Sequence, residues 1–130
     1  MIWWYVAFGS ACGGAARFAV ATLVQQRLGA NFPVGTLVVN VTGSFLIGLL
    51  LRYALGTTAI SPEMRALLTT GFVGGYTTFS TFSYEALVLL EDGQSVRAGL
   101  YVLLSVVLSL AATWLGVTAA RALLAARVQS

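Results

Sequence analysis

The sequence contains no histidine and only one cysteine, Cys12. The lack of histidine excludes a histidine-based metal site or proton relay, and a lone cysteine allows no disulfide within the chain. Charged residues are also scarce, at 8% of the 130 residues, where soluble domains carry roughly 25%. The net charge of +3 comes from arginines spread singly along the chain, a pattern that argues against nucleic-acid binding.

Apolar residues make up 58% of the chain, and the mean hydropathy is +0.89. So short a chain cannot hide that much apolar surface in a soluble fold, so we predict an all-α integral membrane protein in contact with the lipid bilayer. A membrane span needs about 20 apolar residues, and four segments fit, at approximately 3–27, 34–55, 63–90 and 97–123. The connections between them are short, with a first turn at 29–33, so residues 1–130 form one domain. Ser61 before Pro62 is typical of a helix N-cap and predicts where the third span begins.

The third span is interrupted at residues 71–85, Gly-Phe-Val-Gly-Gly-Tyr-Thr-Thr-Phe-Ser-Thr-Phe-Ser-Tyr-Glu. Glycine weakens a helix, here at Gly74-Gly75, so we predict a break within this stretch, where protein, water or an ion must satisfy the freed backbone groups. Phe79 and Phe82, three residues apart, share a helix face just beyond it. Such a pair most often serves packing. Beside a break and many hydroxyls, however, the positive ring edges could bind a small anion loosely enough to release it.

The other three spans carry small or polar residues at every fourth position. These are Gly9, Gly13 and Arg17 in the first span, Thr36, Asn40 and Ser44 in the second, and Tyr101, Ser105, Ser109 and Thr113 in the fourth. The glycines predict close helix packing, whereas Arg17 is compatible either with a functional role or with snorkelling to the interface. Asn40 could join helices or donate its amide to an anion. The hydroxyls of the fourth span could follow a pore or bond to their own helix.

The motif Gly-Phe-Val-Gly-Gly-Tyr-Thr-Thr-Phe-Ser-Thr-Phe-Ser at 71–83 resembles that of the Fluc fluoride channels, also called the CrcB family. Two further segments support the likeness, Gly35-Thr-Leu-Val-Val-Asn40-Val-Thr-Gly-Ser44 and Gly13-Gly-Ala-Ala-Arg17-Phe, and it extends over essentially the whole chain. The resemblance implies a fluoride-selective channel that exports F⁻ passively and is not an enzyme. It also implies an antiparallel, dual-topology homodimer with two fluoride pathways in the inner membrane of a prokaryote.

The resemblance also implies roles for individual residues. By this likeness, the ring edges of Phe79 and Phe82 meet fluoride, Asn40 is the pore asparagine, and Arg17 lies near a pore entrance. The remaining pathway residues are Tyr101, Ser105 and Ser109 on the pore-lining helix, and Ser80, Ser83, Thr113 and Glu85 on a polar track further along. The backbone carbonyls of Gly74 and Thr77 match those that bind a buried structural Na⁺ at the dimer axis.

The distribution of arginine is compatible with insertion in both orientations. Four spans place both termini and the 56–62 turn on one side, near Arg52, Arg65, Arg121 and Arg127, with Arg27 and Arg97 on the other. Arginine is what the positive-inside rule counts, so the bias is only four to two. The main alternative function is a small dual-topology multidrug exporter, which needs a carboxylate inside the membrane to exchange protons for a cation. The first span contains none, and Arg17 would repel cations. A membrane enzyme or a purely structural subunit has less support, since no nucleophile–base pair is visible and a structural role leaves the polar stripes unexplained.

Overall fold

The computed structural model describes residues 1–28 and 31–130, and every regular element in these ranges is helical. Three helices of the described residues are long and apolar enough to cross a membrane: α1 (Ile2–Leu28), α2 (Val34–Leu55) and α6 (Ser95–Gln129). The predicted third span is a row of shorter helices: α3 (Pro62–Ala66), the π-helix η1 (Leu67–Val73), α4 (Gly74–Tyr76) and α5 (Phe79–Glu91). The predicted all-α fold with a broken third span is thus confirmed. Of the predicted first turn, residues 29 and 30 lie outside the described ranges.

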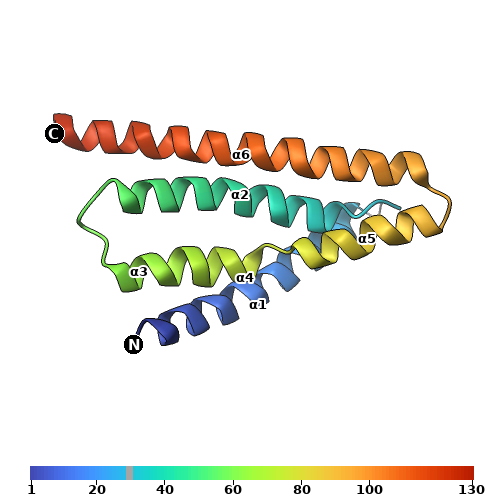
Figure 1. The fold of residues 1–130 in the computed structure, drawn as a ribbon, viewed down its shortest axis with the longest axis horizontal. Helices are drawn as coiled ribbons and strands as arrows, with labels where there is room; N and C mark the ends of the chain where they lie inside the picture. The colour runs from blue at the N-terminus through green and yellow to red at the C-terminus, as the bar shows by residue number, and fades with distance from the viewer. Residues whose placement is uncertain (29–30) are drawn as a thin grey trace.

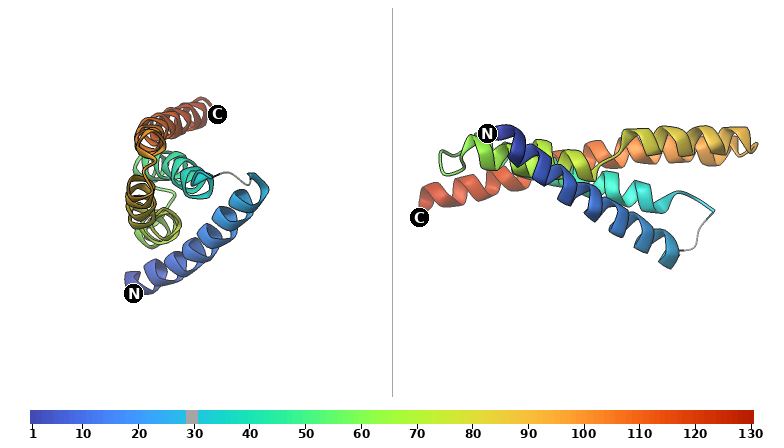
Figure 2. Two further views of the ribbon diagram at one scale, coloured as in Figure 1. Left: turned by 90° about the vertical axis from the view of Figure 1, so that its right-hand side faces the viewer. Right: turned by 90° about the horizontal axis from the view of Figure 1, so that it is seen from below.

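The helices are arranged around a long contact between α2 and α6, which lie side by side along most of α2 (Figure 1). The broken span runs alongside them, and α1 crosses it obliquely, diverging from the other helices toward its carboxyl end (Figure 2). Both termini and the loop between α2 and α3 lie at one end of the molecule, as the four-span prediction requires (Figure 1).

Glycines allow α2 and α6 to touch backbone to backbone. A Cβ added at Gly48 would collide with the carbonyl of Thr113, and one at Gly116 with the carbonyl of Phe45. The Thr113 hydroxyl adds a cross-helix hydrogen bond of 3.1 Å to the carbonyl oxygen of Ser44. Close approach of this kind is how membrane helices gain packing energy without a hydrophobic driving force between them. At 35 residues, α6 extends beyond the predicted span 97–123 at both ends.

The third span begins where the sequence predicted and breaks within the predicted stretch 71–85. The Ser61 hydroxyl accepts a 3.2 Å hydrogen bond from the Met64 amide, with Pro62 in the first helical position, so the predicted N-cap is confirmed. The break lies at Thr77 (φ −80°, ψ 158°) and Thr78 (φ −150°, ψ 107°), both extended. Gly74 and Gly75, the pair expected to weaken the helix, are themselves helical, and the chain leaves the helix just after them, at Thr77.

The glycines of the third span serve a helix crossing. A Cβ on Gly75 would lie 2.6 Å from the Ser10 carbonyl oxygen, and one on Gly71 would lie 3.0 Å from the Gly9 Cα. From the other side, a Cβ on Gly13 would collide with the Phe72 carbonyl. The predicted close packing at Gly9 and Gly13 is therefore confirmed, and its partner surface is formed by η1 and α4.

Candidate functional site

Side chains from two other helices satisfy the backbone at the break. The Asn40 amide of α2 donates to the Thr78 carbonyl (3.0 Å), and its oxygen accepts from the Thr78 amide (2.8 Å). Arg17 of α1 donates from Nη1 to the Thr77 carbonyl at 3.3 Å. The freed peptide groups of Thr77 and Thr78 thus have protein partners. An amide NH₂ carries two hydrogens, so Asn40 keeps one donor beyond its bond to Thr78.

The break also brings two helix ends of opposite polarity together. The carboxyl end of α4 carries partial negative charge, and the amino end of α5 carries partial positive charge. The Thr78 hydroxyl caps α5 by accepting from the Thr81 amide at 3.2 Å. The other backbone N–H groups in the first turn of α5 point out of the amino end of the helix. Cations are therefore favoured beside α4, where Arg17 lies, and anions beside the start of α5, where Phe79 lies.

A groove of about 670 Å³ opens beside the break, between α2, α6 and the third span. It is lined by seven of the predicted site residues, namely Asn40, Gly74, Thr77, Phe79, Phe82, Ser105 and Ser109. The Phe79 side chain is 78% exposed, and its ring lies 5.5 Å from that of Phe82, centroid to centroid, at 56°. A tilted pair of this kind presents ring edges as well as faces to the groove.

The hydroxyls of Ser105 and Ser109 remain available to a ligand. Both line the groove from α6, and no hydrogen bond is formed by either one within residues 1–28 and 31–130. No fully buried polar side-chain atom of the described chain lacks a partner, so these hydroxyls reach the open groove. Two neutral donors thus face the same space as the Asn40 amide and the phenylalanine rings.

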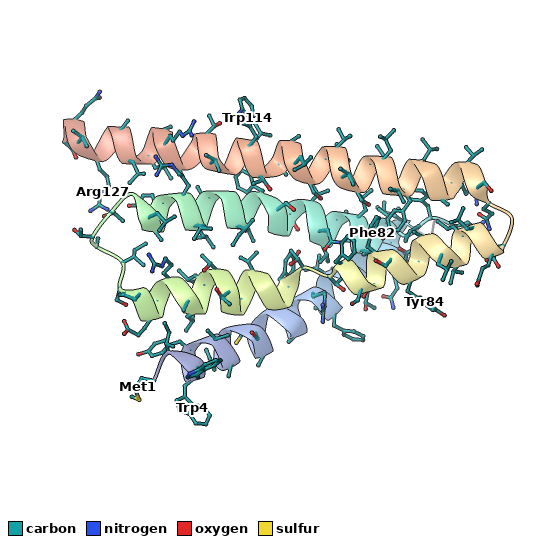
Figure 3. All side chains as sticks on the ribbon, viewed as in Figure 1. Met1, Trp4, Phe82, Tyr84, Trp114 and Arg127 are labelled. Atoms are coloured by element: carbon teal, nitrogen blue, oxygen red, sulfur yellow. The ribbon has the colours of Figure 1, made fainter. Side chains whose placement is uncertain are left out.

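A second row of contacts leads from Phe82 away from the groove. The Phe82 ring lies 5.1 Å from the buried ring of Tyr101, and Figure 3 shows Phe82 directed from α5 toward α6. The Tyr101 hydroxyl donates to Glu85 Oε2 (3.3 Å), and Thr36 donates to Glu85 Oε1 (2.6 Å). Glu85 and Thr36 line a second cavity of about 660 Å³ at the far end of α2 and α5. The aromatic contact and these hydrogen bonds therefore connect the two cavities.

The other predicted residues lie outside the groove. Ser83 is exposed and bonds back to the Phe79 carbonyl (3.0 Å), and Ser80 lies 3.3 Å from the Thr78 hydroxyl, oxygen to oxygen. The bond from Thr113 to Ser44 occupies its hydroxyl in the α2–α6 contact. Arg17 contacts the break itself. Of the stripe on α6, only Ser105 and Ser109 have free hydroxyls facing the groove.

Two threonines and one serine of the site were not among the site residues predicted from the sequence. Thr36 holds Glu85, Thr78 forms the break, and Ser44 lines the groove. The fourfold spacing of Thr36, Asn40 and Ser44 contained the signal for two of them, because it places all three on one face of α2. Nothing local to Thr78 distinguishes it from the hydroxyl residues around it.

Comparison with known proteins identifies the family. The family described as CrcB-like protein, Camphor Resistance (CrcB), matches residues 4–117. The chain belongs to the CrcB family. Among curated CrcB relatives, the protein of Geobacter metallireducens is 53% identical over 116 residues, covering 89% of this chain and 94% of the relative. That of Geobacter sulfurreducens is 54% identical over 118 residues, covering 91% and 95%. That of Pelobacter propionicus is 50% identical over 119 residues, covering 92% of each.

Each of these CrcB proteins bears the name fluoride-specific ion channel FluC. The matched residues 4–117 include the whole break and both cavities. Residues 1–3 and the last part of α6, which extends to Gln129, lie beyond the CrcB match.

Proposed function

We propose that this protein is a fluoride-specific ion channel, through which F⁻ leaves the cell down its electrochemical gradient, and that it is not an enzyme. Membership of the CrcB family and about 50% identity to proteins named as fluoride channels support this function. The observation that carries it at the level of residues is the groove at the break. There the Phe79–Phe82 pair, the Asn40 amide and two free serine hydroxyls face one space.

The chemistry of the groove suits a small anion in transit. Neutral donors and positive ring edges replace part of the hydration shell of fluoride, and the amino end of α5 adds a favourable field. A full positive charge in direct contact would hold the ion too firmly for conduction. Chloride is larger and more weakly hydrated, so it gains less from this set of small neutral donors.

The pathway continues, in this proposal, from Phe82 past Tyr101 and Glu85 to the second cavity. The Tyr101 hydroxyl donates a hydrogen bond to Glu85. In this proposal, the same hydroxyl donates to a fluoride ion instead while the ion passes. Thr36 holds the other carboxylate oxygen and keeps Glu85 in place during the exchange. The secondary members of the route are Ser80, Ser83 and Thr113, whose hydroxyls already have hydrogen-bond partners within the protein.

The assembly in this proposal is an antiparallel homodimer in the inner membrane of a prokaryote. The groove is open along one side of the protomer, with Gly74, Leu51 and Leu110 among its lining residues, so a second copy has a surface to cover. The four-to-two distribution of arginine between the two ends is compatible with both orientations.

The Gly74 and Thr77 carbonyls are, in this proposal, the ligands of a structural Na⁺. Both residues line the open groove, and Thr77 ends the helix. The helical donor to the Gly74 carbonyl would be the Thr78 amide, which binds Asn40 instead. The Thr77 carbonyl accepts from Arg17, but a carbonyl oxygen has a second lone pair. Neutral oxygens are suitable ligands for a hard cation, so the residues fit the ion.

Fluoride efflux from liposomes tests the function. The purified protein is reconstituted with internal fluoride or chloride at equal concentration, and efflux is followed with ion-selective electrodes. We expect rapid fluoride efflux and chloride efflux no faster than from protein-free liposomes. Equal efflux of both anions, or none of either, would contradict the proposal.

A further inference from the structure

The position of α1 against the third span is fixed by glycine contacts. Gly9 and Gly13 leave no room for a Cβ against η1 and α4, and Gly75 leaves none against Ser10. Arg17 follows Gly13 by four residues, so it lies on the same face of α1, one turn further along. The crossing that seats Gly13 on Phe72 and Tyr76 thus carries Arg17 to the end of α4, where the helix breaks.

At that end, the Arg17 guanidinium meets the Thr77 carbonyl at 3.3 Å. A cation at the carboxyl end of a helix is stabilised by the helix dipole and by hydrogen bonds to the last carbonyls. Asn40 holds the next peptide group, at Thr78, from the opposite side. The break is therefore held by two side chains, one from α1 and one from α2.

We propose that Arg17 is a positioning residue of the channel: by binding the Thr77 carbonyl, it holds the break and so sets the direction in which α5 leaves it. Phe79 begins α5 two residues after Thr77, so a change of backbone angles at Thr77 and Thr78 would swing both phenylalanine rings out of the groove. The contact between Arg17 and the Thr77 carbonyl does not depend on the proposed function. Only its consequence for fluoride flux rests on the proposed fluoride conduction. Positioning by Arg17 differs from the attraction of anions to a pore entrance. Any nearby cation provides that attraction, and dissolved salt screens it.

Hydrogen exchange tests the contact without reference to fluoride. Arg17→Met removes the guanidinium and keeps an unbranched apolar side chain. Arg97→Met is the matched control, because Arg97 also donates to a backbone carbonyl, that of Asn31 at 3.4 Å, far from the break. We expect the segment 77–83 to exchange about tenfold faster or more in Arg17→Met, the effect of losing a charge-assisted hydrogen bond, and to be unchanged in Arg97→Met. Equal exchange of segment 77–83 in wild type and Arg17→Met would overturn the proposal.

Fluoride efflux at two ionic strengths separates positioning from attraction. Positioning predicts the same fractional loss of flux for Arg17→Met at low salt and at 1 M salt, where charges further apart than about 3 Å are screened. Recovery of wild-type flux at high salt would overturn it in favour of attraction. If wild-type protein moved no fluoride, the proposed function would fail, and the exchange measurement would still decide the role of Arg17.

Arg17→Lys provides the second variant if Arg17→Met does not yield folded protein. Lysine keeps the charge, but its ammonium is more strongly hydrated and ends short of the guanidinium nitrogens. Faster exchange in segment 77–83 together with reduced flux would support positioning. Wild-type exchange and flux in Arg17→Lys would overturn it.

Discussion

Phe79 and Phe82 occupy different surroundings although they belong to one pair. Phe79 is 78% exposed and projects into the groove, whereas Phe82 packs against the buried ring of Tyr101. Substitution of each residue therefore separates ion contact from packing, which the sequence alone could not do.

We predict that Phe79→Ile suppresses fluoride flux and leaves the stability of the protein nearly unchanged. Isoleucine fills much of the apolar volume and has no ring edge, and the exposed Phe79 ring contributes little to the core. Phe82→Ile should also suppress flux, and it should cost about 1 kcal/mol in addition because the contact with Tyr101 is lost. Liposome efflux and thermal unfolding of the monodisperse protein measure the two effects. Normal flux from folded Phe79→Ile would assign this ring to packing alone.

Asn40 shows what residue-level reasoning could and could not obtain from the sequence. Its position inside a span predicted a polar role, either joining helices or contacting an anion. The structure shows the first, through the backbone of Thr78, and leaves one amide hydrogen for the second. The partner lies 38 residues away and is a peptide group, so no side-chain pattern in the sequence could identify it.

At the scale of elements, the crossing of α1 over η1 and α4 depends on individual glycines. We predict that Gly13→Ala destabilises the protein by about 1–3 kcal/mol, as overpacking does, because its Cβ collides with the Phe72 carbonyl. Gly14→Ala is the neighbouring control: its Cβ meets nothing within 4 Å, and alanine favours the helix by up to about 1 kcal/mol. Thermal unfolding in detergent compares them. Equal melting temperatures for the two variants would show that the crossing is not tightly packed.

The sequence predicted the helices well and the break only in outline. Hydropathy located the three long helices and the broken span between them, and the cap at Ser61 fixed the start of that broken span. The sequence attributed the break in 71–85 to Gly74-Gly75 because glycine is a poor helix former. In the fold, Gly75 supplies the close contact with Ser10 instead, and the extended residues are threonines held by Asn40 and Arg17. Contacts between helices thus override local helix propensity, and the sequence pattern of one span does not reveal those contacts.

At the scale of the whole molecule, orientation in the membrane is open to direct measurement. We predict that both orientations occur in comparable amounts, because arginine favours one end only four to two. Cys12 is exposed, so it is first replaced by alanine, and Ser130→Cys then provides a single thiol at the exposed C-terminus. A membrane-impermeant thiol reagent should label this cysteine from either side of the membrane. Labelling from one side alone, in protein that still conducts, would rule out the antiparallel dimer.

The proposed Na⁺ links the break to the dimer, so its removal is a test of the whole assembly. We predict that thorough sodium depletion, with no replacement cation, abolishes fluoride flux or weakens the dimer, because neutral carbonyls brought together need a cation between them. Flux in liposomes and the dimer fraction in size-exclusion chromatography measure both effects. Unchanged flux and dimer fraction would show that the break serves another purpose.

Two variants locate the effect on the proposed carbonyls. Thr77→Ser keeps the backbone oxygen and the hydroxyl that bonds to the Val73 carbonyl, so it should retain the sodium dependence of the wild type. Gly74→Val should lose it. Within one protomer, a Cβ on Gly74 meets nothing closer than the Thr69 carbonyl oxygen at 3.7 Å, an ordinary contact, so the first added carbon has room in the folded chain. The loss must then arise where the groove meets the ion or the second copy. Wild-type sodium dependence in a folded Gly74→Val dimer would therefore place the ion elsewhere, even if the dimer itself requires sodium.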